Sequence, residues 1–270
     1  MTARLWLIGG TQESRQLVQQ LHTALAPSPP SSALLITVTT EAARSLYPDL
    51  APDQIWVGQL TPDRAEQFVA AQGITAILDV SHPFATAISQ LAIAIAQRHQ
   101  LPYLRYERPA PAAMLTGWRD RRDRPGLRQL SQLRDLLTDE SLASDRTLLT
   151  LGYRQLAAFA PWQSRAPLFA RILPSPIALQ TALAQGFTPD RLIALRPPIS
   201  PELEQALWQQ WQITQVVTKA SGTPGGQAAK RQLAARLGVR LVEITRPAIA
   251  YPQQSDRLDT ALNFALRYGG

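Results

Sequence analysis

The chain has 270 residues, of which 45% are hydrophobic and 17% charged, a composition typical of a folded globular protein. It contains no cysteine, which excludes a disulfide framework, a thiol nucleophile and cysteine-based zinc or iron–sulfur sites, and which fits a cytoplasmic protein. The formal net charge of +7 favours acidic partners, either nucleic acid or a small molecule rich in phosphate or carboxylate groups.

The basic residues do not form a nucleic-acid-binding pattern. Most arginines are scattered, and the densest group is Arg119, Arg121, Arg122, Arg124 and Arg128. Aromatic residues do not alternate with them, so we expect no nucleic-acid partner. The longest weakly polar stretch, 84–96, is shorter than the roughly 20 residues of a membrane span. The first apolar run ends at Gly9-Gly10 and is too short for a signal-peptide core. We expect no membrane partner and favour a monomer.

Strands and helices alternate through the first part of the chain. Apolar runs predict strands at 4–8, 33–39, 55–57, 76–80 and 102–106. Helices are predicted from the glycines after the first strand to about Leu25, from Thr61-Pro62-Asp63 onward, and over 83–99. Continuous apolar strands in a βαβα order predict a parallel sheet covered by helices on both faces.

A second α/β series follows an irregular stretch at 109–145. Strands are predicted at 147–151, 168–173, 192–195, 215–218 and 240–244, and helices at 177–185, 201–211, 226–237 and 256–267. The expected fold class is α/β, with two lobes that each contain a parallel sheet and with a cleft between them. We predict that the lobes comprise residues 1–110 and 111–270.

The first strand leads into Gly9-Gly10-Thr11 and a helix. Glycines allow a close approach to the backbone, and the free N–H groups of a helix start bind anions, so this junction suits a phosphate. The spacing differs from GxGxxG, with Ser14 in the place of a third small residue. A tight turn without a ligand is the alternative interpretation.

The second strand ends beside Thr39, Thr40 and Arg44, which suit the 2′-phosphate of NADP in a dinucleotide-binding fold. Glu41 is a competing feature, since an acidic residue there favours NAD. Arg44 as an ordinary solvated helix residue is an equally good interpretation of the spacing.

Asp79, Ser81 and His82 follow a buried strand and precede a helix. Ligands of open α/β sheets gather at such carboxyl ends, so these side chains could position a cofactor or polarise a substrate. A histidine with a purely structural hydrogen bond is the alternative. A GxSxG nucleophile elbow is absent. The three histidines, the others being His22 and His99, are not paired as metal ligands would be.

In the second series, Lys219 ends a strand and precedes Ser221-Gly222 and a further pair of glycines. This arrangement could hold a carboxylate or phosphate, although the lysine precedes the glycines, unlike in a Walker A loop. Tyr153, between Gly152 and Arg154, marks another candidate anion contact. Structural turns are the alternative in both places.

Taken in order, these segments resemble the precorrin-6A reductase family of cobalamin biosynthesis, in both its aerobic and its cobalt-precorrin branches. The resemblance rests on Leu7–Thr11 with Glu13, Asp79–Ala85, Leu104–Pro109 and Val217–Gly222, and it extends to Leu149–Gly152 with Phe159-Ala160. It spans most of the chain outside the irregular stretch.

The resemblance implies an NADPH-dependent reductase with two Rossmann-like lobes, the cofactor on the first and a polyanionic tetrapyrrole-derived substrate in the cleft. Hydride would pass to a ring carbon of precorrin-6A, with or without cobalt, to give precorrin-6B. Hydride transfer needs positioning by the protein rather than a protein nucleophile or metal. Two alternatives stay open: another NADP-linked reductase or epimerase, and a non-catalytic nucleotide-sensing module.

The resemblance also implies roles for the candidate residues. The pyrophosphate would contact Gly9, Gly10 and Thr11, and the adenosine end would contact Thr39, Thr40 and Arg44. Ser81 and His82 would lie near the nicotinamide. Lys219, Ser221 and Gly222 would contact the substrate, together with Arg105 or Tyr153. His82 is the first candidate for the proton donor, with Lys219 and an ordered water molecule as competitors.

Overall fold

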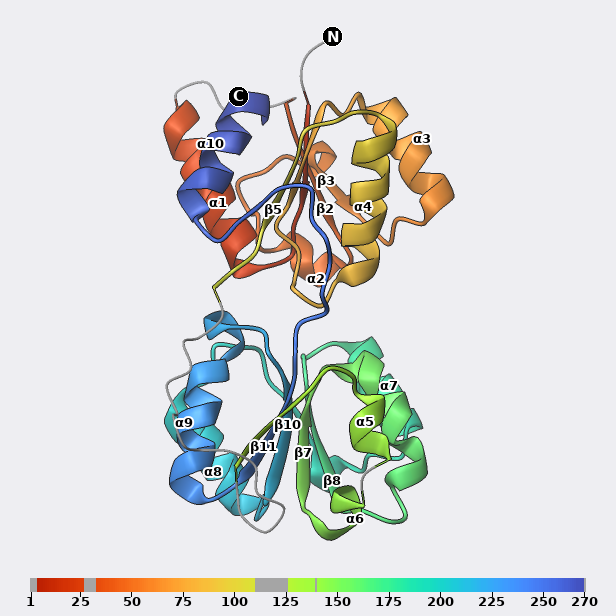
Figure 1. Cartoon of the computed structure of the whole chain (residues 1–270), viewed down its shortest axis with the longest axis vertical. Helices are drawn as coiled ribbons and strands as arrows, with labels where there is room; N and C mark the ends of the chain where they lie inside the picture. Colours follow the sequence, from red (N-terminus) through yellow and green to blue (C-terminus); the bar gives the residue numbers. More distant parts are fainter. Residues whose placement is uncertain (1–3, 27–32, 110–125, 139, 270) are drawn as a thin grey trace. The chain divides into compact units, whose positions relative to one another are not determined.

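The computed structural model describes residues 4–26, 33–109, 126–138 and 140–269, which form two compact units. Unit 1 comprises Met1–Pro109 and Pro247–Gly270, and unit 2 comprises Ala110–Arg246. Each unit has its own six-stranded parallel sheet with helices on both faces (Figure 1). The α/β fold class with two parallel sheets is therefore confirmed. Four arginines of the densest basic group lie outside the described residues: Arg119, Arg121, Arg122 and Arg124.

The sheet of unit 1 has the strand order β12-β5-β4-β1-β2-β3. Its strands are β1 (Leu5–Ile8), β2 (Leu34–Val38), β3 (Ile55–Val57), β4 (Ala76–Asp79), β5 (Tyr103–Tyr106) and β12 (Gln254–Ser255). Its helices are α1 (Gln12–Leu25), α2 (Glu41–Arg44), the 3-10 helix η1 (Pro52–Gln54), α3 (Pro62–Gln72), α4 (Thr86–Arg98) and α10 (Leu258–Gly269).

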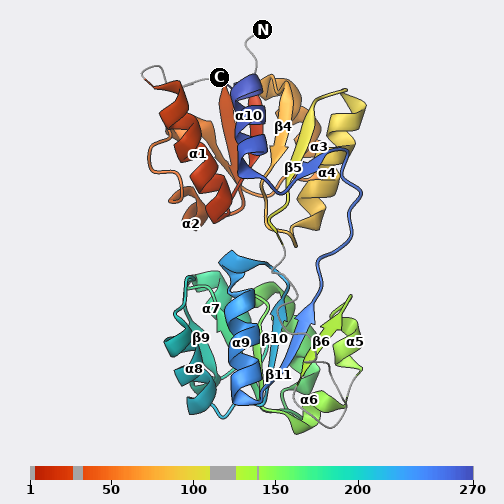
Figure 2. The ribbon, with the colours of Figure 1, turned by 60° about the vertical axis from the view of Figure 1, so that its left-hand side comes forward.

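The core of unit 1 is divided by the sheet into two apolar layers. Side chains alternate along a strand, so Leu5 and Leu7 of β1 pack with buried residues of α1 and α10, while Trp6 and Ile8 pack with those of α3 and α4. Figures 1 and 2 show these helix pairs on opposite faces. Both layers consist of buried apolar side chains, which explains why the strands read as unbroken apolar runs.

The sheet of unit 2 has the strand order β6-β11-β10-β7-β8-β9. Its strands are β6 (Leu127–Leu130), β7 (Thr147–Thr150), β8 (Leu168–Ile172), β9 (Leu192–Ala194), β10 (Gln215–Lys219) and β11 (Arg240–Ile244). Its helices are α5 (Arg134–Leu137), α6 (Ser141–Ser144), η2 (Tyr153–Trp162), α7 (Pro176–Ala184), η3 (Pro189–Arg191), α8 (Pro201–Gln210), η4 (Thr223–Gly225) and α9 (Gln227–Leu237). Trp208 of α8 and Leu233 of α9 pack on one layer of its core.

The predicted lobe boundary is wrong at its C-terminal end. Residues 247–270 belong to unit 1, although the predicted second lobe ran from 111 to 270. The physical reason is that β12 pairs with Arg105 and Tyr106 of β5, while Ala261 and Ala265 of α10 are fully buried in the core of unit 1.

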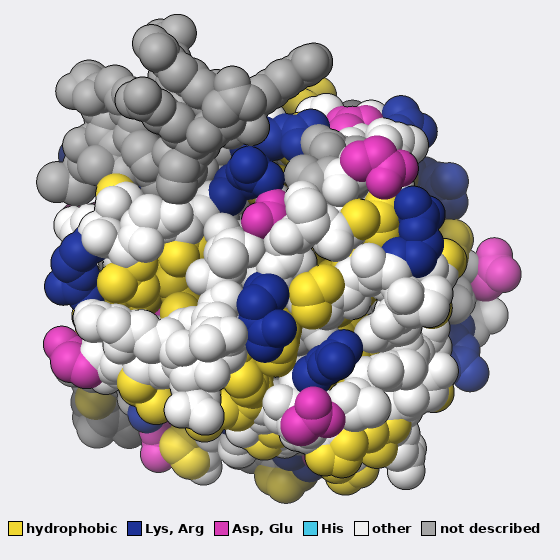
Figure 3. All heavy atoms as spheres, turned by 90° about the horizontal axis from the view of Figure 1, so that it is seen from below, with side chains coloured by type: hydrophobic (Ala, Val, Ile, Leu, Met, Phe, Trp, Pro, Cys, Tyr) yellow, Lys and Arg dark blue, Asp and Glu magenta, His cyan; other side chains and the backbone are white. Residues whose placement is uncertain are grey.

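Several short elements differ from the predicted ones. The strands β6 and β12 and the helices α2 and η2 were not predicted, and α4 begins at Thr86 rather than at Pro83. In the described part of the chain, no helix has the length and apolar character of a membrane span. One face of the molecule intersperses basic, acidic and apolar side chains (Figure 3), as expected for scattered arginines.

Candidate active site

The turn between β1 and α1 is fixed by reciprocal hydrogen bonds. Thr11 caps the helix: its Oγ1 accepts from the Ser14 N–H at 3.1 Å, and Ser14 Oγ accepts from the Thr11 N–H at 3.0 Å. Thr11 Oγ1 also donates to the Val80 carbonyl at 2.8 Å, which ties this turn to the end of β4. The N–H groups of Gln12 and Glu13 have no acceptor within the helix, so this helix start can bind an anion.

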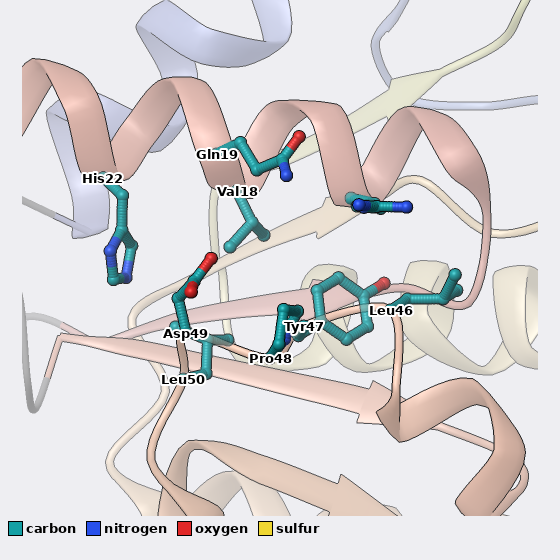
Figure 4. Close-up of a pocket in the computed structure, with 9 residues that line it drawn as sticks. Val18, Gln19, His22, Leu46, Tyr47, Pro48, Asp49 and Leu50 are labelled. Atoms are coloured by element: carbon teal, nitrogen blue, oxygen red, sulfur yellow. The ribbon is translucent and has the colours of Figure 1, made fainter.

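Tyr47 supports the same turn from below. Its hydroxyl accepts from the Gly10 N–H at 2.8 Å and lies 2.6 Å from Ser14 Oγ. The ring lies beneath α1 beside Leu46 and Pro48 (Figure 4) and is 3% exposed. Burial raises the pKa of Tyr47, so the hydroxyl stays protonated. Sequence reasoning missed this residue.

A buried ion pair adjoins the first turn of α1. Glu13 Oε1 lies 2.9 Å from Arg108 Nε, and both side chains are about nine-tenths buried. The contact is an ion pair without the alignment of a directed hydrogen bond. Arg108 offsets a negative charge that would otherwise repel an anion at this helix start. Both residues lie within segments that carried the family resemblance, which was the available signal.

The predicted adenosine side lies at the next strand. Because β2 neighbours β1, the exposed Thr39 and Thr40 lie at the same edge of the sheet as the glycine turn. Thr40 Oγ1 accepts from the Ala43 N–H at 3.3 Å, and Arg44 Nε lies 3.2 Å from Glu41 Oε2. Arg44 and Glu41, the two residues with opposite predicted preferences for the cofactor, thus form an ion pair within α2. Arg44 lines a hollow of about 320 Å³ between α2 and η1.

Asp79 is a buried hub at the end of β4. Its Oδ1 accepts from Arg105 Nη1 at 2.7 Å and from the Ser81 N–H at 3.0 Å. Its Oδ2 accepts from Ser89 Oγ at 2.6 Å and from the Tyr103 hydroxyl at 3.0 Å. Asp79 is fully buried, and four donors satisfy its charge. The carboxylate therefore fixes the backbone that leads to Ser81.

Arg105 belongs to this hub. It is 1% exposed and donates to Asp79, to Ser81 Oγ at 2.9 Å and to Glu107 Oε2 at 2.8 Å. Burial opposes its charge, but Asp79 and Glu107 more than offset that effect and raise the pKa of Arg105. The sequence suggested a substrate contact. The structure instead buries Arg105 beneath the turn, where its guanidinium orients Ser81.

His82 follows Ser81 and is half-buried. Its Nδ1 accepts from the Phe84 N–H at 3.2 Å. A neutral imidazole that accepts at Nδ1 carries its proton on Nε2. The Thr11–Val80 bond keeps the start of the turn after β4 beside the glycine turn.

Two cations meet at the carboxyl edge of the unit 2 sheet. Lys219 ends β10, and Tyr153 and Arg154 follow the neighbouring strand β7. Burial, and then the nearby Arg154 charge, lower the pKa of Lys219. The Arg154 guanidinium carbon lies 5.6 Å from the centre of the Tyr153 ring. The predicted residues Lys219 and Tyr153 are thus at one edge, and the electrostatics favour an anion there.

The turn that follows β10 is held from below by α9. The Gly222 N–H donates to Gln227 Oε1 at 2.9 Å, and Gln227 Nε2 donates to Glu243 Oε2 at 3.0 Å. Gly222 has a φ of +79°, and Ser221 is buried against Gly225. This network positions Ser221 and Gly222, much as Asp79 positions Ser81.

Both lysines of the chain flank this turn. Lys230 is 4% exposed, and its Nζ donates to the Gly225 carbonyl at 2.7 Å. Burial, and then the Arg171 charge, lower the pKa of Lys230 to about 8. Sequence reasoning singled out Lys219 but missed Lys230, whose only signal was the scarcity of lysine. Within the described ranges, no three His, Asp or Glu side chains group as metal ligands would.

Comparison with known proteins places the fold. A solved structure of CobK precorrin-6A reductase matches with a TM-score of 0.74 at 21% sequence identity, covering 100% of this chain and 98% of that one. At this identity the likeness shows the fold, including its two units.

Two reductases match this chain over nearly its full length and over nearly all of their own. Cobalt-precorrin-6A reductase of Synechocystis sp. is 43% identical over 98% of this chain and 97% of its own. Precorrin-6A reductase of Rhodococcus erythropolis is 30% identical over 95% of this chain and 93% of its own.

The family model described as "Precorrin-6x reductase CbiJ/CobK" matches residues 4–265. A reductase of this family implies a reduced nicotinamide cofactor. The chain therefore belongs to the precorrin-6x reductase CbiJ/CobK family, as a reductase of cobalamin biosynthesis.

Proposed function

We propose that this protein catalyses hydride transfer from NADPH to the macrocycle of precorrin-6A or its cobalt complex, giving precorrin-6B or cobalt-precorrin-6B. The observation that carries the proposal is the Thr11–Val80 hydrogen bond of 2.8 Å. It holds an anion-binding helix start beside Ser81 and His82, so that one edge of the sheet offers both a pyrophosphate site and a proton donor.

The residues of unit 1 fit a dinucleotide. The start of α1 offers N–H groups to the pyrophosphate, and the absence of a side chain at Gly10 permits its approach. Thr39, Thr40 and Arg44 would hold the adenosine end, with Arg44 exchanging Glu41 for the 2′-phosphate. Bound NADPH would supply the hydride.

His82 is the proposed proton donor. Reduction of a carbon–carbon double bond adds one hydride and one proton. His82 would deliver the proton from Nε2 as an imidazolium and return to the neutral form, which requires Nδ1 to exchange the Phe84 N–H for a proton before the transfer. Ser81, which is held by Asp79 and Arg105, orients the reacting groups beside it. Lys219 and an ordered water molecule remain the competing donors.

Unit 2 supplies the substrate contacts in this proposal. Lys219 and Arg154 attract carboxylates, and Ser221, Gly222 and Tyr153 line the same edge of the sheet. The net charge of +7 supports a polyanionic substrate. The relative that is 43% identical is a cobalt-precorrin-6A reductase by name, so cobalt-precorrin-6A is the first substrate to test.

The test is an anaerobic incubation with cobalt-precorrin-6A and NADPH, in which the visible spectrum and the absorbance at 340 nm are followed together. We expect coupled loss of both signals, faster with NADPH than with NADH. The metal-free macrocycle is assayed in parallel. If NADPH binds but is oxidised with neither macrocycle, the proposed substrates are refuted, and that result favours a nucleotide-sensing module.

The proton donor is tested separately by His82→Gln and Lys219→Gln. We expect His82→Gln to lower kcat about 100-fold, within the range of general-acid contributions, while the Kd of NADPH stays unchanged. If His82→Gln retains full kcat and Lys219→Gln loses it, Lys219 is the donor instead.

A further inference from the structure

The Tyr47 hydroxyl fills the space directly beside Gly9 and Gly10 in the turn between β1 and α1. It satisfies the Gly10 N–H, with a hydrogen bond of 2.8 Å, and contacts Ser14 Oγ at 2.6 Å. A Cβ atom at Gly9 would overlap this hydroxyl and would lie 3.0 Å from Ile36 Cγ2. The glycine at position 9 is thus required by the Tyr47 side chain, whatever the ligand needs.

The backbone of Tyr47 continues directly from the adenosine side. The Tyr47 N–H donates to the Arg44 carbonyl at 3.0 Å, directly after α2. The side chain then runs beneath α1, beside a small hollow that α1 and Leu46–Leu50 enclose (Figure 4). One residue therefore connects the segment that carries Arg44 with the turn that carries Gly10 and the cap of α1.

We infer that Tyr47 is a positioning residue for the dinucleotide: its hydroxyl sets the conformation of the Gly9–Thr11 turn and couples that turn to the Arg44 segment. The inference rests on the proposed binding of NADPH to unit 1. It also changes one expected contact. Because Tyr47 takes the Gly10 N–H, the pyrophosphate is met by the N–H groups of Gln12 and Glu13 at the start of α1.

The hydroxyl alone is removed by Tyr47→Phe. We expect the Kd of NADPH, measured by calorimetry without substrate, to rise about tenfold, because the hydrogen bond that fixes the Gly10 backbone is lost. The Kd of NADH should rise by the same factor, since both cofactors share the pyrophosphate. The kcat at saturating NADPH should stay unchanged. The matched control is Tyr268→Phe, a partly buried tyrosine of α10, which should leave both Kd values unchanged.

A double-mutant cycle separates this role from general destabilisation. Gly9→Ala forces a Cβ atom onto the Tyr47 hydroxyl, and Tyr47→Phe removes that oxygen. The melting temperature of the double variant should therefore exceed that of Gly9→Ala alone. Gly73→Ala is the control, because a Cβ there meets nothing within 4 Å and its effect should add to that of Tyr47→Phe.

The outcomes are distinguishable from those of the proposed function. If the unaltered protein binds no NADPH, the proposed function fails and the melting-temperature cycle still tests the Tyr47–Gly9 contact. If the unaltered protein binds NADPH and Tyr47→Phe binds it equally well or more tightly, the inference is overturned. A Kd that rises for NADPH but not for NADH would also overturn it, because the effect would then come from the 2′-phosphate end.

Discussion

The two units share one strand order but fill its last place differently. From the inside outward, β1-β4-β5-β12 of unit 1 corresponds to β7-β10-β11-β6 of unit 2. The outermost strand of unit 1 comes from the C-terminal segment, after unit 2 is complete, whereas that of unit 2 precedes all its other strands. The shared order puts β4 and β10 in equivalent places, and both precede turns that carry candidate site residues.

Each of these turns is held by a fully buried carboxylate. Asp79 lies on β4 itself and reaches Ser81 directly, with Arg105 from the neighbouring strand as its cation. Glu243 lies on β11 and reaches Gly222 through Gln227 of α9. The carboxylate therefore contacts the turn directly in unit 1 and through a helix residue in unit 2.

The two edges also differ in charge. In unit 1 the buried cations Arg105 and Arg108 each contact a carboxylate, so the turns offer N–H groups and hydroxyls. In unit 2, burial and then the charge of the nearby Arg154 lower the pKa of Lys219, so two positive charges lie at one edge. We infer a division of work in which unit 1 binds its ligand through backbone donors and unit 2 binds through charge.

The largest expected effect is a loss of stability when a buried carboxylate is neutralised, and it should be larger for Asp79 than for Glu243. Asp79→Asn leaves the Arg105 guanidinium, which is 1% exposed, with Glu107 as its remaining carboxylate partner. We expect the free energy of unfolding, measured by urea denaturation, to fall by about 3 kcal/mol, because four buried donors lose their charged acceptor.

The matched variant in unit 2 is Glu243→Gln. Its partner Arg231 has a side chain that is 12% exposed and can reach solvent, so we expect a smaller loss of about 1–2 kcal/mol. Equal losses in the two variants would mean that the burial of the partner cation does not determine the cost.

The charge at the unit 2 edge predicts the next largest effect. Lys219→Gln should raise the KM for the macrocycle about 10–100-fold, the value of one charge-assisted contact, without changing the Kd of NADPH. The KM of the unaltered protein should increase with salt more steeply than that of the variant.

The scarcity of lysine gives an independent measurement of the same contact. Only Lys219 and Lys230 are present, and Lys230 is 4% exposed, so an amine-specific label should modify Lys219 preferentially. Bound macrocycle should protect Lys219 in peptide mass spectra. Labelling that is unaffected by the macrocycle would place the substrate carboxylates elsewhere.

The sequence predicted the parts of this molecule that depend on local pattern. Unbroken apolar runs revealed β1 and β3, and a strand–glycine–helix junction revealed the turn at Gly9. The strand β12 could not be found in this way, because Gln254 and Ser255 form a strand only through pairing with β5. The same limit applies to the end of unit 2, since only tertiary packing assigns residues 247–270 to unit 1.

The candidate site residues show the same limit: local pattern indicates some of them and tertiary contacts determine the others. Ser81 and Lys219 became candidates because each follows a predicted strand. Tyr47 was missed because its hydroxyl acts on a residue 37 positions away, and nothing in its own segment marks that contact. Arg105 was predicted as a substrate contact, because the sequence does not reveal that three acceptors on its own unit surround it.

A third prediction compares the buried cations of the two units. Arg105 is held in its charged form, whereas the pKa of Lys230 falls to about 8 from 10.5. Between pH 8 and pH 10.5 the Lys230 amine is protonated in the unfolded chain but not in the folded protein, so the free energy of unfolding should rise with pH. Relative to Lys230→Met, the unaltered protein should gain about 2 kcal/mol between pH 7.5 and 9.5.

The control for this pH dependence is Lys230→Arg, which keeps its charge over the same range. Urea denaturation of the three proteins at several pH values gives the comparison. Parallel pH profiles for the unaltered protein and Lys230→Met would show that Lys230 does not lose its proton in this range.

The smallest expected effect concerns the one exposed charge that unit 1 would use for its ligand. The Arg44 side chain is 39% exposed and bound to Glu41, so the 2′-phosphate gains only the difference between two partly screened contacts. We expect Arg44→Ala to raise the Kd of NADPH about fivefold and to leave that of NADH unchanged. Arg64→Ala, on the exposed side of α3, is the control. Since Tyr47→Phe should weaken both cofactors equally, the ratio of the two Kd values separates recognition of the 2′-phosphate from positioning of the turn. If Arg44→Ala raises the Kd of NADPH and that of NADH by the same factor, Arg44, too, acts through the backbone of unit 1 rather than through its charge.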